Sequence, residues 1–195
     1  MTDIVRAIRH GLSNLTRFSG REPPLRFWPY VLSVIALAIA AMAVAFAATM
    51  APVFARMQRF AAEHPEQATV TTGPGHYSVQ IEGPVPPDLF PDFTPLVFGM
   101  AVAIAIAVVL LAATVARRLH DRGLSGAWGL APLPFLAVGL ALLPKVFTAQ
   151  DPSPGLLLGL FFNNVLYMAL LALLAVLLFK GSDPGPNRYG PPNVA

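Results

Sequence analysis

The sequence contains no cysteine, and charged residues make up only 12% of its 195 residues. The absence of cysteine excludes a disulfide framework, a thiolate metal site and a cysteine nucleophile. Soluble domains average about 25% charged residues, and a soluble core of this length could not bury a chain that is 55% hydrophobic. Such high hydrophobicity also excludes intrinsic disorder for most of the chain. The composition therefore predicts a protein that is embedded in lipid.

Four long stretches of the chain lack Asp, Glu, Lys and Arg altogether, and they contain 29, 24, 22 and 28 residues. A hydrocarbon layer about 30 Å thick needs about 20 apolar helical residues, whose backbone amides must be hydrogen-bonded within the segment. We therefore expect an all-α membrane protein with four transmembrane helices in a membrane domain over 30–179. The expected spans are about 30–54, 94–116, 127–143 and 156–179. In the third span, Pro132 and Pro134 predict a kink.

Lysine and arginine are distributed unequally between the two sides that these spans define. Ten of them lie in the segment 1–29, in the loop between the second and third spans and in the tail 180–195, whereas three lie in the loops on the other side. By the positive-inside rule, both termini then face the cytoplasm and the loop 55–93 is external. The sequence pI of about 9.7 reflects this topology, so no nucleic-acid partner is expected.

The segment before the first span has the pattern of an amphipathic helix. Ile4, Ile8, Leu12 and Leu15 recur at helical spacing, and arginines occupy the opposite side. This pattern predicts a short interfacial helix along the cytoplasmic headgroups, where its arginines would meet anionic lipid. A helix that binds a partner protein is the alternative interpretation.

The external loop contains two strand-like stretches, 68–72 and 76–81, on either side of Gly73-Pro74-Gly75. Alternating residues around a glycine-rich turn predict a small β-hairpin. His64 and His76 could bind a metal, but no third ligand has suitable spacing, so a solvated loop is the favoured interpretation. We expect neither a metal site nor a cofactor.

The loop after the second span reads Arg-Arg-Leu-His-Asp-Arg-Gly-Leu-Ser-Gly-Ala-Trp over 117–128. If the second helix continues past the membrane surface, Arg117 and Asp121 lie four residues apart and can form an ion pair. Gly123 suits a left-handed helix end, and Ser125 suits the N-cap of the third helix. A rigid connector accounts for every residue of the loop. The alternative is an anion site in which guanidinium groups bind phosphate.

Candidate contact residues for an anion, a lipid or a partner gather on the cytoplasmic side. They are Arg21, Arg117, Arg118, His120, Asp121, Arg122, Asn187, Arg188 and Tyr189. Two tryptophans at the ends of spans are predicted interface anchors, namely Trp28 and Trp128. Small and amide side chains in the last span are predicted to pack helices together, within one chain or between copies in a homo-oligomer, namely Gly155, Gly159, Asn163 and Asn164.

Three of these cytoplasmic stretches also carry a family resemblance. They are Phe-Ser-Gly-Arg at 18–21, the loop 117–128, and the tail ending in Gly-Pro-Asn-Arg-Tyr-Gly at 185–190. On these residues the chain resembles the YhaH-like family of bacterial inner-membrane proteins, also called domain of unknown function 805. It departs from the family pattern at Ala127, where the first of two tryptophans is usual. The resemblance implies a bacterial inner (plasma) membrane location and no established activity.

Three functions therefore remain open. The first is an accessory or binding protein whose basic cytoplasmic face contacts lipid headgroups or a partner protein. A small-solute transporter or channel is the alternative, although the spans lack the charged residues and histidines that usually mark ion paths. An enzyme acting on lipid headgroups would use His120 and Asp121 as acid and base. Gly-Leu-Ser-Gly at 123–126 resembles a rhomboid protease motif, but no histidine follows it, so no catalytic residue is expected.

Overall fold

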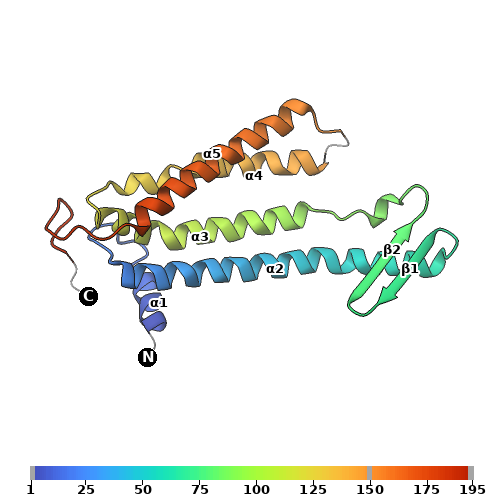
Figure 1. The fold of residues 1–195 in the computed structure, drawn as a ribbon, viewed down its shortest axis with the longest axis horizontal. Helices are drawn as coiled ribbons and strands as arrows, with labels where there is room; N and C mark the ends of the chain where they lie inside the picture. Colours follow the sequence, from blue (N-terminus) through green and yellow to red (C-terminus); the bar gives the residue numbers. More distant parts are fainter. Residues whose placement is uncertain (1–2, 149–150, 193–195) are drawn as a thin grey trace. The chain divides into compact units, whose positions relative to one another are not determined.

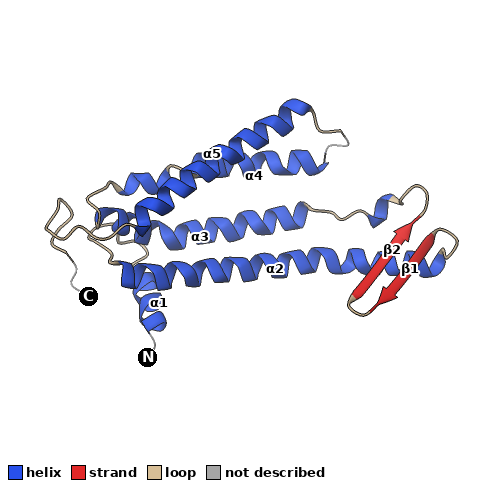
Figure 2. Ribbon diagram, viewed as in Figure 1, coloured by secondary structure: helices blue, strands red, loops and turns tan. Residues whose placement is uncertain are grey.

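The computed structural model of the chain describes residues 3–148 and 151–192, which are mostly helical (Figures 1 and 2). The chain divides into two compact units, one formed by residues 1–41 with 101–195 (unit 1) and one by residues 42–100 (unit 2). In chain order, the elements are α1 (Asp3–Ser13), α2 (Pro24–Glu63), β1 (Ala68–Gly73), β2 (His76–Ile81), the 3-10 helix η1 (Pro87–Leu89), α3 (Thr94–His120), the 3-10 helix η2 (Gly126–Leu130), α4 (Leu133–Thr148) and α5 (Pro154–Phe179).

Four helical segments are long and apolar enough to cross a membrane. Their most apolar windows have mean hydropathies of 2.6 in α2, 2.9 in α3, 1.8 in the segment Gly126–Val146 and 2.2 in α5. Large apolar side chains along them are exposed, such as Leu37, Val109 and Phe162. Lipid tails are as apolar as leucine, so these side chains need no protein core around them. The expected all-α membrane fold with four transmembrane helices is confirmed, and the small sheet is a minor addition.

Helix α2 extends beyond the expected span 30–54 at both ends, from Pro24 to Glu63. Proline is favoured at the start of a helix, where its missing N–H costs nothing. At the other end, the residues after Phe54 are mostly strong helix formers, and the next proline or glycine is Pro65. The length of an uncharged stretch indicates which part of a helix lies in lipid. Where the helix ends is decided by helix propensity and by the next proline or glycine.

The third span is interrupted, as its prolines predict. The short helix η2 ends at Leu130, and α4 begins at Leu133 after a turn. The N-cap predicted at Ser125 is present, because its hydroxyl accepts a hydrogen bond from the Ala127 N–H at 3.3 Å. The helix end predicted at Gly123 is also present, since this residue has a φ of +67°.

Unit 2 contains the predicted hairpin. Its two strands pair antiparallel, with Ala68 opposite Ile81 and Gly73 opposite His76.

Where α3 begins, the carboxylate of Asp92 accepts a hydrogen bond from the Thr94 N–H at 2.9 Å, which lowers the pKa of Asp92. The proposed metal ligand His64 lies 3.4 Å from the carboxylate of Glu66, and the side chain of His76 lies outside the described part of the structure.

In unit 1, α1 packs on the first turns of α2 and runs at a steep angle to that helix (Figure 1). Ala7 of α1 packs with Tyr30 and Val34 of α2 in a buried cluster. Gly11 lies so close to the Tyr30 ring that an added Cβ would come within 2.4 Å of it. The Tyr30 hydroxyl in turn donates to the Leu110 carbonyl of α3 at 2.9 Å. One tyrosine thus holds α1 and α3 against α2.

The other helices of unit 1 meet at the end where α3 and α5 finish. Phe27 of α2, Leu119 of α3 and Leu178 of α5 form a second buried cluster there. Helices α4 and α5 lie side by side (Figure 2), and the Asn163 amide of α5 donates to the Phe135 carbonyl of α4 at 2.9 Å. This packing brings the polar residues at the ends of α3 and α5 next to the segment that precedes α2.

Candidate functional site

Three arginines and two carboxylates form a buried cluster at this end of unit 1. We call it the arginine–carboxylate network, and its members are Arg21, Glu22, Arg117, Arg118 and Asp121. Each of these residues is at most 4% exposed, and Arg118 is completely buried. Buried charges are stable only when they are paired and hydrogen-bonded. The partners of each member therefore decide what the network can do.

The carboxylates join different parts of the chain. Glu22 accepts from Arg117 Nε at 2.7 Å, and the backbone N–H of Glu22 donates to the Arg117 carbonyl. Asp121 accepts from Arg21 Nε at 2.9 Å and from Arg118 Nη1 at 2.6 Å. The ion pair that helical spacing predicts between Arg117 and Asp121 is therefore wrong. Asp121 lies beyond the end of α3, and the Arg117 guanidinium bonds to the segment before α2 instead.

Donors of Arg118 and of the neighbouring Arg122 bond to the carboxyl-terminal end of α5. Arg118 donates to the carbonyls of Leu178 at 3.1 Å and Lys180 at 2.6 Å, and Arg122 donates to the Leu177 carbonyl at 2.8 Å. The last carbonyls of a helix have no partner within the helix and carry partial negative charge. The end of α5 thus helps to compensate the excess positive charge of the network, in which three arginines face two carboxylates.

The tail after α5 closes over the network. Arg21 donates to the carbonyls of Asp183 at 2.6 Å and Gly185 at 2.8 Å. The Ser182 hydroxyl donates to the carboxylate of Asp121, and the Asn187 amide donates to the His120 carbonyl at 3.0 Å. The described part of this proline- and glycine-rich tail forms no helix or strand, and these bonds attach it to two other segments of unit 1, the one before α2 and the one at the end of α3.

The two aromatic side chains of the predicted contact set stack on each other. The rings of His120 and Tyr189 are nearly parallel, with their centroids 3.7 Å apart, and the Arg188 guanidinium lies 4.8 Å from the centre of the Tyr189 ring. The His120 ring thus faces Tyr189, whereas the Asp121 oxygens bond to Arg21, Arg118 and Ser182. This arrangement gives Asp121 a structural role.

A family model described as "Protein of unknown function (DUF805)" matches residues 15–191 of this chain. The chain belongs to the DUF805 family. The match covers the whole arginine–carboxylate network and the tail that closes over it, whereas helix α1 precedes the matched region. No curated protein and no solved structure matches the chain. The DUF805 description assigns no activity.

The structure brings most of the predicted contact residues of this DUF805 chain together, but it turns several of them inward. Arg21, Arg117, Arg118 and Asp121 are buried in the network, and only Arg188 of the predicted set is exposed. Contact of the whole set with a lipid or a partner stays a prediction. The described contacts of the four buried residues are with other parts of the same chain.

Sequence reasoning missed three partners in the network, namely Glu22, Ser182 and Asp183. A signal for Glu22 exists, because it is the one acidic residue between Asp3 and the first span in a strongly basic segment. Ser182 and Asp183 gave no such signal, since short polar residues in a proline- and glycine-rich tail are typical of any solvated loop.

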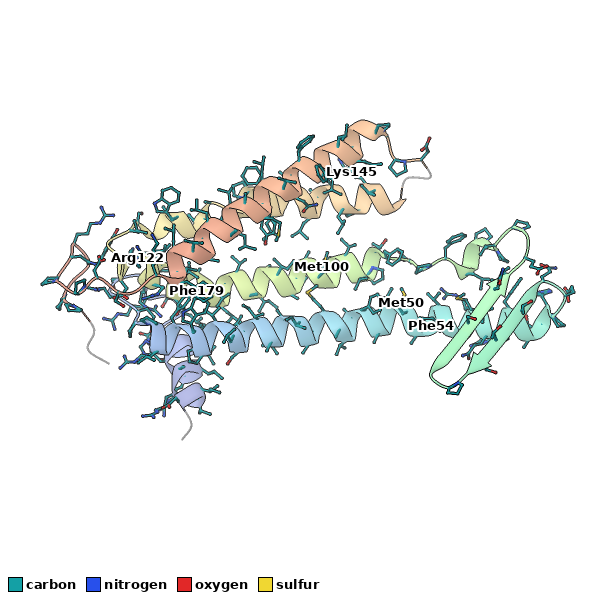
Figure 3. The ribbon with its side chains drawn as sticks, viewed as in Figure 1. Met50, Phe54, Met100, Arg122, Lys145 and Phe179 are labelled. Carbon is teal, nitrogen blue, oxygen red and sulfur yellow. The ribbon has the colours of Figure 1, made fainter. Side chains whose placement is uncertain are left out.

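The predicted anchors and packing residues have different surroundings. The Trp28 ring stacks on Phe179 with centroids 4.1 Å apart, whereas Trp128 is exposed. Figure 3 shows Phe179 and Arg122 near one end of the α4–α5 pair and Lys145 near the other. Asn163 joins α5 to α4. The other three predicted packing residues are exposed on the surface of the chain, namely Gly155, Gly159 and Asn164. Their packing between copies of the chain stays a prediction.

A different set of cations is exposed beside the network. Its members lie on α1, in the segment after it and in the first turn of α2. We call them the α1 basic surface: Arg6, Arg9, Arg17 and Arg26. Within the described residues, no three His, Cys, Asp or Glu side chains gather as metal ligands would. The chemistry that this surface offers is therefore that of guanidinium groups in water, which bind phosphate and carboxylate.

Proposed function

We propose that this DUF805 protein is a non-catalytic, lipid-binding protein of the bacterial inner (plasma) membrane, with both termini in the cytoplasm. Its α1 basic surface contacts anionic lipid headgroups. The observation that carries this proposal is the division between buried and exposed arginines. Arg21, Arg117 and Arg118 bond within the chain, whereas the α1 basic surface is left exposed at the same end of unit 1.

Helix α1 has three faces that fit this role. Ala7 and Gly11 are buried against α2. One residue advances about 100° around a helix, so Ile4 and Leu12 lie on one side of this docked face, and Arg6 lies on the other side. The apolar pair is half exposed. A helix that leaves leucine and isoleucine exposed on one side and arginine on the other lies in the interface between headgroups and acyl chains.

The competing functions lose support from the same contacts. Asp121 would be needed as an acid or base, but both of its carboxylate oxygens accept hydrogen bonds from arginine. Asn163 is the buried polar side chain of α5, and its amide bonds to a backbone carbonyl of α4, which is the usual use of an amide between membrane helices. Solute transport and headgroup chemistry are therefore outcomes to exclude by experiment.

The proposal is tested by measuring lipid preference at the protein surface. The protein is reconstituted in vesicles, and the association constants of spin-labelled phosphatidylglycerol and phosphatidylcholine are compared. Each basic residue near an anionic bilayer contributes about 1 kcal/mol. We expect a preference of at least about twofold for phosphatidylglycerol, which declines toward one in about 0.5 M salt because exposed charges are screened.

A variant with all four arginines of the α1 basic surface changed to glutamine should lose this preference. The control is the double variant Arg59→Gln, Lys145→Gln, which removes exposed cations from the other expected side of the membrane. An unchanged preference in the fourfold variant would refute the proposal. Solute flux into sealed vesicles, or phospholipid turnover by the wild-type protein, would instead favour a transporter or an enzyme.

A further inference from the structure

A groove lies between α1 and the first turns of α2. It encloses about 740 Å³ and is lined by Asp3, Arg6, Ala7, His10, Leu25, Arg26 and Pro29. This volume is within the range of about 300–1,000 Å³ that is typical of small-molecule sites. Polar residues of α1 form one wall, and the first turns of α2 form the other.

A second, smaller cavity of about 280 Å³ continues from the same place. His10 and Arg26 line both spaces, so they stand where the two meet. The smaller cavity is lined mainly by polar side chains, among them Asn14, Arg17 and Ser19. The larger one has apolar side chains on its α2 wall, namely Leu25 and Pro29. The two adjacent spaces, which we treat as one depression, therefore differ in polarity and share His10 and Arg26 at their junction.

We propose that this depression is a specific site for one anionic phospholipid with a hydroxylated headgroup, and this inference rests on the proposed function. The phosphodiester lies at the junction and accepts hydrogen bonds from Arg26, with His10 beside it. The headgroup hydroxyls occupy the polar cavity, and the glycerol ester region lies against Leu25 and Pro29. A zwitterionic lipid is disfavoured because its ammonium group would enter a cavity that is lined by Arg17 and Arg26.

The charges that face the junction favour an anion. Arg17 and Arg26 are exposed, and their guanidinium groups match the two free oxygens of a phosphodiester. The nearby carboxylates already have cationic partners, because Asp3 pairs with Arg6 and Glu22 pairs with Arg117. His10 Nε2 lies 3.3 Å from Glu22 Oε1. Two buried arginines of the network, Arg21 and Arg117, also line the smaller cavity.

Native mass spectrometry of the full-length protein in detergent tests the site, with dioctanoyl-phosphatidylglycerol as the probe. We expect one lipid to bind each chain at least about tenfold more tightly than dioctanoyl-phosphatidylcholine. Arg26→Gln should weaken this binding about tenfold, since it removes a charge-assisted hydrogen bond. Lys180→Gln removes an exposed cation from the start of the tail, outside both cavities, and should change the binding less than about twofold.

Two further measurements separate the possible failures. Glycerol 1-phosphate in place of the lipid should bind at least about tenfold more weakly, because it lacks the apolar part. Equal binding would assign the site to a free phosphate ester and overturn the lipid assignment. Equal losses in Arg26→Gln and Lys180→Gln would refute the groove. In that case, the proposed function would still hold if the protein kept its preference for phosphatidylglycerol in vesicles. If that preference were absent, both the lipid site and the proposed function would be refuted. An unchanged far-ultraviolet circular dichroism spectrum verifies that the variants fold.

Discussion

Asp121 is the residue on which two buried arginines depend. Replacing it by asparagine keeps the shape but removes the charge that balances Arg21 and Arg118. The N–H₂ group of asparagine also replaces one of the two acceptor oxygens, so one arginine donor faces another donor. Breaking a buried pair costs about 3–5 kcal/mol, since the remaining charge stays buried without compensation. We expect Asp121→Asn to lower the free energy of unfolding by about that amount, measured by titrating detergent-solubilised protein with dodecyl sulfate and following helicity.

The chain offers a matched control for this effect. Asp3 also pairs with an arginine three residues away, Arg6, but the two side chains are 86% and 68% exposed. Exposed pairs contribute about 0–1 kcal/mol because water and side-chain entropy oppose them. Asp3→Asn should therefore stay within about 1 kcal/mol of the wild type. Similar losses for Asp3→Asn and Asp121→Asn would contradict the structural role of the network.

Individual side chains also show how far the sequence could predict this site. The basic loop identified Arg117, Arg118 and Asp121 as important, because charged residues at the end of an apolar helix stand out. Their partners could not be assigned in the same way. Spacing along a helix describes only local pairs, whereas Arg117 bonds to a glutamate 95 residues earlier and Arg21 to an aspartate 100 residues later. Such pairs depend on how the helices pack.

Helix α1 depends on a close approach that only glycine permits. A Cβ on Gly11 would lie 2.4 to 2.6 Å from three atoms of the Tyr30 ring, so Gly11→Leu should displace α1 from α2. Because the chain has no cysteine, the single variant Ala7→Cys reports on docking. Ala7 is only 3% exposed. In the Ala7→Cys background, we expect Gly11→Leu to raise the rate of maleimide labelling by at least about tenfold. A buried thiol reacts only when α1 is undocked, and the leucine makes the undocked state more frequent.

Ser13→Leu provides the comparison for this experiment, because Ser13 is an exposed residue of the same helix. It adds a side chain of the same size without entering the contact with Tyr30. Its labelling rate should stay close to that of the single variant. If both leucine variants label at the unchanged slow rate, α1 does not dock through Gly11.

At the scale of elements, the sequence predicted which segments are helical better than where they end. Long apolar stretches identified all four spans, since lipid forces such segments into helices. The ends follow from other causes, as α2 shows by extending to Glu63. The conformation of the tail had no local signal. It is fixed by bonds from Arg21 and Asn187 to backbone carbonyls, and these depend on the complete fold.

At the scale of the whole molecule, the distribution of charge and the number of spans must give the same topology. Four spans place both ends of the chain on one side, and ten of the 13 lysines and arginines then lie on that side. Arg21, Arg117 and Arg118 are among these ten, although they are buried in the folded protein. The positive-inside rule acts during insertion, before such arginines are enclosed. Their burial therefore leaves the expected orientation unchanged.

Single cysteines in the otherwise cysteine-free chain test this topology directly. Ser13→Cys, Thr72→Cys and Pro186→Cys each place a thiol at an exposed position, on α1, on the hairpin and on the tail. In bacterial spheroplasts, a membrane-impermeant maleimide should label only Thr72→Cys, because the proposed topology places the other two thiols in the cytoplasm. After lysis all three should react, which verifies that each thiol is accessible. Labelling of just one of Ser13→Cys and Pro186→Cys in sealed spheroplasts would place the two ends of the chain on opposite sides of the membrane. An odd number of crossings would then follow, and the α1 basic surface and the tail could not share one side of the membrane.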